Sequence, residues 1–258
     1  MRTKQRLDLS TFDGQLLDGL DFCSKVYDLF DQLQNEPDGV AKLRLRPTLT
    51  EKRLIEELLP IAHYVQARYR AGLRIKVRWF SGSQPYDAIL SSSGGLVKHG
   101  AAPRKLFLEV TIAVHRNDYF RRKLLQERGG SFGVKGISRD KKTREIVSKP
   151  YVHTSDEPAA DLAGQIIKAI TAKVNKYPPA TVLIVNCVTD GLIYEPEWND
   201  AIERVTKAQL HPGFWEVFLL EPITLNSATL YGDRKRRRRK ADSGVLHPHT
   251  SRKRGKTA

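Results

Sequence analysis

The apolar residues of the first quarter of the chain recur at helical spacing. Residues 13–34 carry Leu, Val and Phe side chains near every third or fourth position, and the segment 35–39, with its Pro and Gly, ends this pattern. Residues 48–70 repeat the spacing, with an apolar stripe between Leu54 and Val65. The pattern predicts two consecutive helices.

Beyond residue 72 the apolar period changes to two. Residues 73–81 and 106–115 alternate apolar side chains with others, and 86–91 fits a second short strand between them. The Gly- and Ser-rich segment 91–103 separates the second strand from the third, which predicts a hairpin-like return. Three strands that follow one another in this way are expected to be neighbours in one sheet.

The second half of the chain alternates between helical and strand patterns. It is predicted to contain, in order, a short basic helix over 117–128, a polar and basic segment over 131–153 with a hairpin around 139–142, a long helix over 155–176, a buried strand over 181–188, a helix over 197–208 and a strand over 214–220. Successive strands followed by helix–strand crossovers imply an α/β fold, in which a mixed sheet carries helices on both sides.

Charge adds a second signal. The chain of 258 residues has a net charge of +15, and its excess is concentrated in two blocks. Residues 234–258 carry a net +10 and residues 121–149 a net +7, so the remainder is slightly acidic. A solvated surface with a disordered tail would explain this distribution. Concentration into two blocks favours an electrostatic contact surface for nucleic acid.

Composition excludes several classes of protein. The two cysteines, Cys23 and Cys187, cannot build a disulfide framework or a CxxC-type zinc site. The start of the chain has no apolar signal core, and no stretch reaches the ~18 apolar residues of a membrane span. No P-loop, GxGxxG or GxSxG pattern occurs in its required context. We expect a protein that is neither secreted nor in a membrane: cytoplasmic and nucleoid-associated, or nuclear in a eukaryote.

Two carboxylates on the predicted strands suggest chemistry. Asp87 lies on the second strand after Gln84, Pro85 and Tyr86, and Glu109 lies in the middle of the third. If these strands are neighbours, the two carboxylates come within cross-strand distance. Paired carboxylates form a hard oxygen site that suits Mg²⁺ or Mn²⁺. Such an ion can activate a water molecule and neutralise charge on a phosphodiester.

This arrangement resembles the PD-(D/E)XK nuclease superfamily. The matching motif is Pro85-Tyr86-Asp87 with Glu109-Val110-Thr111, set on a helix, three strands, a helix and a strand. The resemblance implies a restriction-endonuclease-like fold and a metal-dependent nuclease that hydrolyses nucleic-acid phosphodiester bonds. Asp87 and Glu109 would be the metal ligands, with Mg²⁺ or Mn²⁺ as the cofactor.

The sequence departs from the family pattern at Thr111, where the family usually has a catalytic lysine. Threonine cannot supply a cation, so a lysine from elsewhere must reach the site or activity is lost. Lys168, Lys123 and Lys105 are the candidates, and Lys168 is favoured because its helix packs on the sheet in the resembled fold. The departure keeps open a catalytically inactive nuclease-like scaffold that binds nucleic acid, and an assembly subunit whose basic tail binds a partner.

Two more residues have a functional and a structural interpretation. The family often adds a glutamate from its first helix, and Glu51 lies on the apolar side of helix 48–70. The same residue completes a Thr48-x-x-Glu51 capping box, which would explain it without catalysis. His115 shares a strand face with Glu109 and could contact a phosphate, but a histidine at a strand end often only caps it. Glu56 and Glu57 are expected to be solvated.

The expected organisation is one nuclease-like α/β domain over 1–232, with a basic insertion over about 117–153, and a disordered basic tail over 233–258. Nucleic acid is the expected partner, DNA in preference to RNA, while protein partners or a homodimer stay open. The contact surface is expected at the basic residues of the insertion: Arg121, Arg122, Lys123, Lys141 and Lys142.

Overall fold

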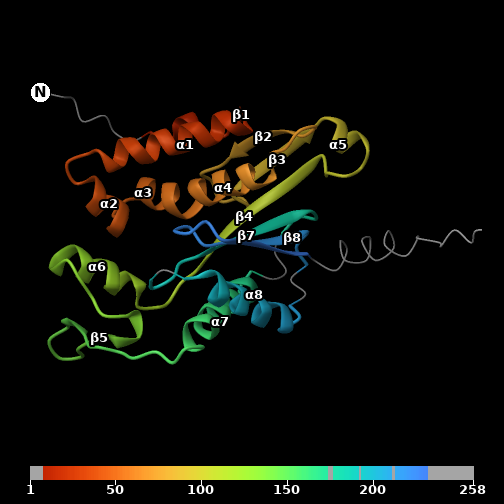
Figure 1. Ribbon diagram of the computed structural model, residues 1–258. Coiled ribbons are helices and arrows are strands. Elements are labelled where there is room, and N and C mark those ends of the chain that lie inside the picture. The colour runs from red at the N-terminus through yellow and green to blue at the C-terminus, as the bar shows by residue number, and fades with distance from the viewer. Residues whose placement is uncertain (1–7, 174–176, 192, 211–212, 232–258) are drawn as a thin grey trace, which may run out of the picture.

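A computed structural model describes residues 8–173, 177–191, 193–210 and 213–231. They form an α/β protein in which a seven-stranded mixed sheet lies between two layers of helices (Figure 1). The strand order is β1-β2-β3-β4-β7-β8-β9, and a separate hairpin, β5-β6, stands outside this sheet. The predicted α/β class with helices on both sides of a mixed sheet is confirmed.

The first half of the sheet is antiparallel and is built from segments that follow one another in sequence. Its strands are β1 (Leu16–Asp18), β2 (Arg74–Trp79), β3 (Ala88–Ser93) and β4 (Lys105–Ala113). Each pairs antiparallel with the next. The alternation in β2 is regular, since Ile75, Val77 and Trp79 are buried while the residues between them are exposed.

The second half of the sheet begins where β7 (Thr181–Cys187) pairs with β4 in parallel. β8 (Glu216–Leu220) continues the parallel arrangement, and β9 (Ser227–Tyr231) returns antiparallel at the edge. All residues of β7 are buried, because helices cover both of its faces. The chain therefore crosses over from β4 to β7, and the crossover carries the long helix α7.

One helical layer covers the face of the sheet that presents Val77, Leu108 and Ile184. It contains α1 (Gly19–Gln34) and a continuous helical stretch made of α3 (Leu49–Arg53), η2 (Leu54–Leu58) and α4 (Leu59–Arg68). Gly19 is required where α1 approaches β2, because a Cβ there would lie 3.0 Å from the carbonyl oxygen of Ile75. This layer and the sheet enclose the larger of two hydrophobic cores.

The stretch from α3 to α4 contains a π-turn over η2. Pro60 follows this turn, and proline has no amide hydrogen to donate to the carbonyl four residues earlier. A wide turn beside a proline accommodates the missing bond, and such turns are frequent at functional sites. Glu57 lies within this turn and is half-buried.

The opposite face of the sheet carries α7 (Glu157–Thr171) and α8 (Glu195–Lys207). Ile166 and Ile170 of α7 pack with Leu183, Val185 and other residues in the second hydrophobic core. α7 contacts β4 and β7, while α8 packs mainly on α7. This layer therefore covers the middle of the sheet and leaves the same face of β2 and β3 to solvent.

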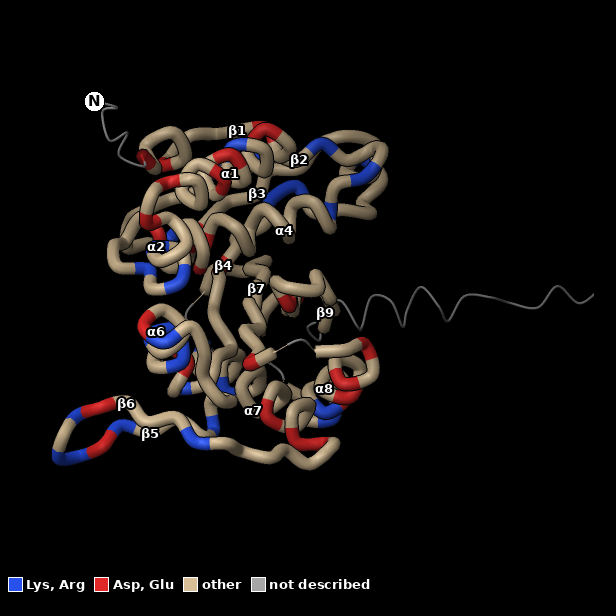
Figure 2. Tube along the Cα trace, turned by 60° about the vertical axis from the view of Figure 1, so that its left-hand side comes forward, with Lys and Arg blue, Asp and Glu red and all other residues tan. Residues whose placement is uncertain are grey.

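An insertion between β4 and α7 projects from one end of the molecule (Figure 2). It contains α6 (Asp118–Arg128), the short η3 (Val134–Gly136), β5 (Ile137–Arg139) and β6 (Ile146–Ser148). The remaining short helices are η1 (Leu9–Thr11), α2 (Gly39–Leu45) and α5 (Gly95–Lys98). The predicted basic helix and hairpin are both confirmed.

Some predicted boundaries are wrong. The first predicted helix, 13–34, is a helix only from Gly19, because residues 16–18 pair with β2 instead. Neither α2 nor β9 was expected: α2 is a short helix directly after the break at 35–39, and β9 forms a sheet edge after Pro222. The tail expected over 233–258 lies outside the described residues. Within the described part of the chain, none of the helices combines the length and apolar character that a bilayer crossing requires.

The two-layered core makes a direct prediction about stability. Ile184 of β7 is fully buried in the larger core, whereas Leu49 at the start of α3 is 65% exposed. Ile184→Ala should lower the free energy of unfolding by about 2–5 kcal/mol, through lost burial and the cavity left behind. Leu49→Ala should change it by less than about 0.5 kcal/mol. Urea titration followed by circular dichroism measures both, and equal losses would contradict the assigned burial.

Candidate active site

Asp87 and Glu109 lie beside each other on neighbouring strands, at the start of β3 and in the middle of β4. Asp87 directly precedes β3, and its amide donates to the carbonyl of Leu108 (2.8 Å). Its carboxylate accepts a hydrogen bond from the amide of Val110 (2.7 Å), the residue after Glu109. The predicted juxtaposition of these strands is therefore confirmed, since β3 and β4 pair in the sheet.

The environment of Asp87 opposes its ionisation. Burial, the charge of Glu109 and the charge of Glu57 together raise the pKa of Asp87 to about 7. The hydrogen bond from Val110 and the charge of Lys173 act in the opposite direction and are outweighed. Asp87 is therefore still partly protonated near neutral pH, because the positive charge around it does not offset its burial and its carboxylate neighbours.

Glu109 has a cationic partner that comes from the end of α7. The Lys173 ammonium lies 2.6 Å from a Glu109 carboxylate oxygen, and the Tyr177 hydroxyl donates to the same oxygen at 3.2 Å. Glu109 is 7% exposed, so the ion pair is largely removed from solvent on the carboxylate side. Burial alone would lower the pKa of Lys173, but the hydrogen bond and charge of Glu109 raise it, so the ammonium stays charged.

A third carboxylate comes from the π-turn. Glu57 accepts a hydrogen bond from the indole nitrogen of Trp79 (3.1 Å), and its charge acts on Asp87. Burial and the charges of Glu56 and Glu109 raise the pKa of Glu57 despite this bond and the nearby Arg53. The expectation that Glu57 is solvated is therefore wrong. Pro60, a proline inside a helical pattern, was the signal in the sequence that could have pointed to an irregular turn beside Glu57.

Carboxylate oxygens are the ligands that a hard divalent cation prefers. Three carboxylates, on Glu57, Asp87 and Glu109, act electrostatically on one another, while Lys173 supplies one positive charge. Burial is the first cause of the raised pKa of Asp87, and a divalent cation beside this group would remove the excess negative charge that adds to it. Asp87 and Glu109 are the residues that could hold it, with Glu57 close enough to contribute charge.

The structure separates the predicted lysines. Thr111 shares the face of β4 with Glu109 and is half-buried, but Lys168 is exposed on α7. The lysine that contacts Glu109 is Lys173, which comes one turn beyond Lys168 at the end of the helix. Lys123 is half-buried and pairs with Glu127 (3.6 Å), and Lys105 lies over the ring of Phe107 (4.6 Å). The sequence favoured Lys168 within α7, whereas the lysine at Glu109 follows the end of that helix.

Glu51 and His115 lie elsewhere. Glu51 completes the capping box of α3, accepting from the Thr48 amide (3.0 Å) and hydroxyl, which is the structural interpretation of this residue. His115 lies beyond the end of β4, where burial lowers its pKa. It lines a pocket of about 360 Å³ that includes none of Asp87, Glu109 and Lys173. Three charged groups of this pocket, Asp118, Arg121 and Asp190, are paired with one another.

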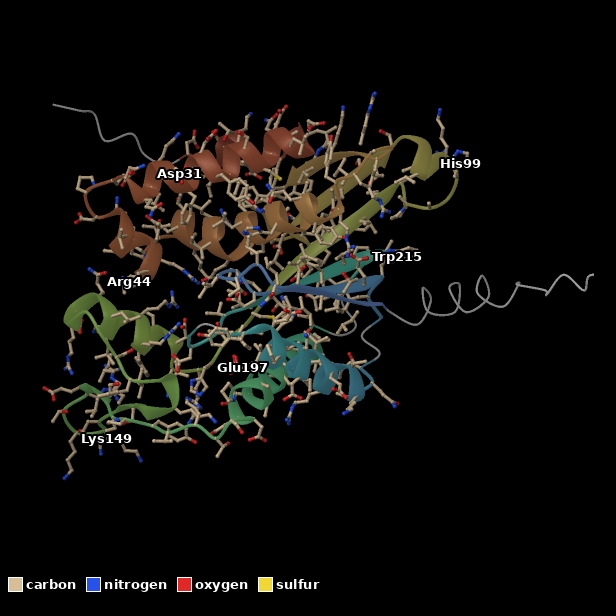
Figure 3. The ribbon with its side chains drawn as sticks, viewed as in Figure 1. Asp31, Arg44, His99, Lys149, Glu197 and Trp215 are labelled. Carbon is tan, nitrogen blue, oxygen red and sulfur yellow. The ribbon has the colours of Figure 1, made fainter. Side chains whose placement is uncertain are left out.

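Most predicted nucleic-acid contacts of α6 are used inside the protein. Arg121 forms ion pairs with Asp118 (3.0 Å) and Asp190 (3.3 Å), and Arg122 pairs with Asp118 (2.9 Å) and donates to the carbonyl of Arg44 (3.1 Å). These contacts connect α6 with α2 and with the end of β7. Figure 3 shows Arg44 on α2, facing the helix α6. Arg121 and Arg122 are therefore structural contacts, Lys123 is half-buried, and the hairpin residues Lys141 and Lys142 are exposed.

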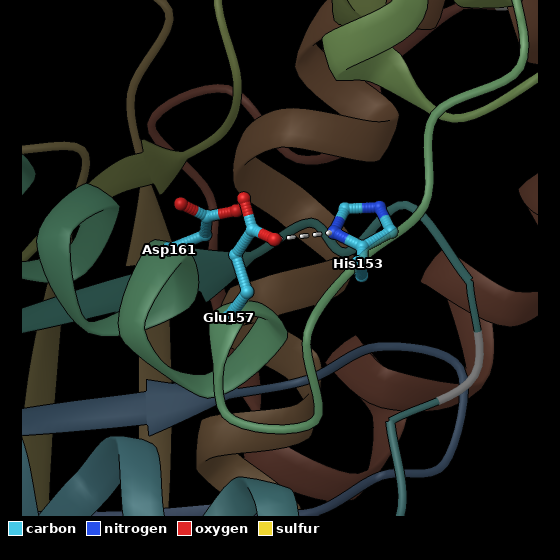
Figure 4. Close-up of side chains that lie close together, drawn as sticks. All are labelled: His153, Glu157 and Asp161. Carbon is cyan, nitrogen blue, oxygen red and sulfur yellow. Dashed lines mark ion pairs between the residues drawn. The ribbon is translucent and has the colours of Figure 1, made fainter.

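A second cluster of metal-ligating side chains was not predicted. His153, Glu157 and Asp161 lie within contact of one another at the start of α7 (Figure 4). Lys135 already occupies this cluster, pairing with Glu157 and with Asp161 (2.6 Å). Hydrogen bonds from Lys135 and Tyr151 lower the pKa of Glu157 to about 2. The cluster thus attaches the insertion to α7, and the Lys135 ammonium balances the charge of its two carboxylates.

In comparisons with known proteins, no family model, curated protein or solved structure matches this chain. The chemistry of the site therefore has to be argued from its own residues.

The pKa of Asp87 predicts a pH-dependent stability. In the folded protein this pKa is about 7, against an ordinary value of 3.8, so the group stabilises the fold at low pH and loses this contribution as the pH rises through 7. Asp87→Asn keeps an acceptor for Val110 but removes the charge. In the presence of a metal chelator, it should raise the free energy of unfolding by about 2–4 kcal/mol at pH 8 and by little at pH 4.

Urea titrations at the two pH values measure this difference. Asp31→Asn, on the exposed surface of α1 (Figure 3), is the matched control and should show no pH-dependent change. An equal effect of Asp87→Asn at both pH values would contradict the proposed ionisation.

Proposed function

We propose that this protein is a metal-dependent nuclease, which hydrolyses nucleic-acid phosphodiester bonds at Asp87 and Glu109. One observation carries the proposal: the Asp87 carboxyl, whose pKa is raised, lies beside Glu109, which forms an ion pair with the Lys173 ammonium. Perturbed titratable groups with a specific charge partner are typical of functional sites. The expected ion is Mg²⁺ or Mn²⁺.

The order of elements supports the resemblance to the PD-(D/E)XK superfamily. A helix ending with α4 precedes the antiparallel strands β2, β3 and β4, and α7 then leads into β7, which is parallel to β4. This is the helix, three strands, helix and strand succession on which the motif was identified. The position of Glu57 also agrees with the glutamate that the family takes from its first helix.

Lys173 answers the objection raised by Thr111. Its ammonium occupies the neighbourhood of Glu109 that the family's lysine would reach from the strand. A lysine can serve the same chemistry from a different position in the sequence, provided that its ammonium group reaches the same place in the site. Here Lys173 comes from the segment directly after α7, with Tyr177 as a second donor to Glu109.

Each residue has a distinct role in the proposed reaction. A bound divalent ion would lower the pKa of a water molecule and neutralise charge on the phosphate. Asp87, oriented by the Val110 amide, and Glu109, oriented by Lys173 and Tyr177, hold ligand oxygens in fixed positions. Lys173 carries a permanent positive charge that stabilises the negative charge accumulating on the phosphate oxygens.

The central test is cleavage that depends on both carboxylates. With Mg²⁺ or Mn²⁺ and single-stranded DNA, duplex DNA and RNA as substrates, the wild-type protein should cleave at least one. Asp87→Asn and Glu109→Gln should reduce cleavage to background, because each removes a ligand from a site with few of them. Glu203→Gln, on the exposed face of α8, should leave cleavage unchanged.

Metal binding gives an independent readout. Mg²⁺ should raise the melting temperature of the wild-type protein at pH 8 and should have no such effect on Asp87→Asn. Absence of both the cleavage and the metal-dependent stabilisation would refute the nuclease assignment. A nuclease-like scaffold that only binds nucleic acid would then explain the fold.

The role of Lys173 can be separated from that of Lys168, which lies in the preceding helix α7. Lys173→Met should lower the rate of cleavage by about 10²–10³-fold, the usual cost of losing one charge-stabilising group. The exposed Lys168→Met should stay within about twofold of wild type. The pH profile of the Lys173 variant should also shift to higher pH, because Lys173 lowers the pKa of Asp87. Loss of activity in the Lys168 variant alone would favour the sequence-based choice instead.

A further inference from the structure

The uncovered face of the antiparallel half-sheet is strongly basic. Arg74, Lys76 and Arg78 alternate with the buried residues of β2, and all three are exposed. They lie on the side of the sheet that α7 and α8 leave open, since those helices pack over β4 and β7. Figure 2 shows basic residues gathered at this end of the sheet, around β2 and β3.

Strand register arranges these residues in rows. Lys76 of β2 is opposite Ser91 of β3, which is opposite Lys105 of β4. Because directly opposed residues share a face, these three side chains form one row across the sheet. Arg74 lies opposite Ser93 in the row on one side.

The row on the other side leads to the candidate site. Arg78 is opposite Ile89, and Ile89 is opposite Phe107. Phe107 contacts Tyr86 (ring centroids 4.8 Å apart), and Tyr86 immediately precedes Asp87. Two residues further along the same face of β4 lies Glu109. The basic rows therefore end at the carboxylates.

The charges on this face are available. Among the described residues, Arg74, Lys76, Arg78 and Lys105 form no ion pair, in contrast to Arg121 and Arg122 of the insertion. Asp18, opposite Lys76 on β1, is the one acidic residue in these rows, and its carboxylate caps α1 through the amide of Leu20 (3.0 Å). Unpaired cations in a row attract a polyanion, and the gain comes from the release of its counterions.

The arrangement favours one nucleic-acid strand over two. The side chains of Arg74, Lys76 and Arg78 follow one another at about 6.6 Å along β2, a spacing comparable to that of successive phosphates in an extended strand. A duplex would need a second basic line for its other backbone, and the described part of this face offers Lys105 alone there. Flat, positively charged surfaces with aromatic residues are typical of single-strand binding.

We infer that Arg74, Lys76, Arg78 and Lys105 bind the phosphates of a single-stranded nucleic acid and lead it across β3 to Asp87 and Glu109. The inference rests on the proposed function for what happens at the end of this path. The binding itself does not require cleavage. DNA and RNA share the phosphate chemistry, so both belong in the test.

The test compares two charge-matched variants of the full chain. Arg74→Gln/Lys76→Gln/Arg78→Gln removes three charges from β2, and Lys141→Gln/Lys142→Gln/Lys149→Gln removes three exposed charges from the hairpin region. Figure 3 shows Lys149 at the opposite end of the molecule from His99, which follows β3 and α5. Fluorescence anisotropy with labelled single-stranded DNA and RNA, with a chelator present, measures Kd at several salt concentrations.

The β2 variant should bind about tenfold more weakly or worse, and its slope of log K against log salt should fall by about 2, as expected for three lost phosphate contacts on a single strand. The hairpin variant, which tests the contact surface expected from the sequence, should lose clearly less affinity than the β2 variant. Arg74→Lys/Lys76→Arg/Arg78→Lys, which keeps the charges, should restore binding. Melting temperatures of all variants verify folding, and in Mg²⁺ the β2 variant should show a raised KM with an unchanged kcat.

Equal losses in the two charge-matched variants would overturn the inference, as would wild-type affinity in the β2 variant. Duplex DNA that binds as tightly as the single strand would overturn the assignment of a single strand. If Mg²⁺-dependent cleavage is absent while the β2 variant still loses binding, the proposed function fails and the binding surface stands. If cleavage depends on Asp87 but is unchanged in the β2 variant, the proposed function stands and the inferred binding surface fails.

Discussion

The ion pair between Glu109 and Lys173 connects the two halves of this protein. Glu109 is a nearly buried carboxylate on a central strand, where an ionised group without a positive partner is costly. Lys173 and Tyr177 satisfy it from the segment that follows α7, so the position of that helix over β4 and the charge balance around Glu109 depend on each other. Asp87, which lacks such a partner, is left with its raised pKa.

The order of strands and helices could be predicted because local patterns determine it. The alternation in β2, the continuous apolar run of β7 and the Gly-rich break before β4 all have their usual structural outcome. Residues 16–18 could not be assigned in the same way. Their leucines fit a helix as well as a strand, and only the neighbouring β2 decides between the two.

The candidate site was predicted to the extent that it lies on neighbouring strands. Asp87 and Glu109 were identifiable because a hairpin brings them together, whereas Glu57 comes from a helix and Lys173 from the segment after one, and packing decides how each helix is rotated. Net charge alone does not reveal which cations are already paired inside the protein, for a related reason. Arg121 and Arg122 lie in the most basic internal segment but are neutralised by Asp118 and Asp190, which sequence distance does not reveal.

The long crossover between β4 and β7 has a consequence for the order in which the protein folds. The hairpins among β2, β3 and β4 close short loops, whereas β7 can join β4 only after the insertion and α7 have been brought back to the sheet. Closing a longer loop costs more entropy, and such non-local pairing forms slowly. Glu109 therefore has neither Lys173 nor Tyr177 while the antiparallel half stands alone. A chain halted at that stage would already display its basic strand, and it would acquire the candidate catalytic centre only with the last strands.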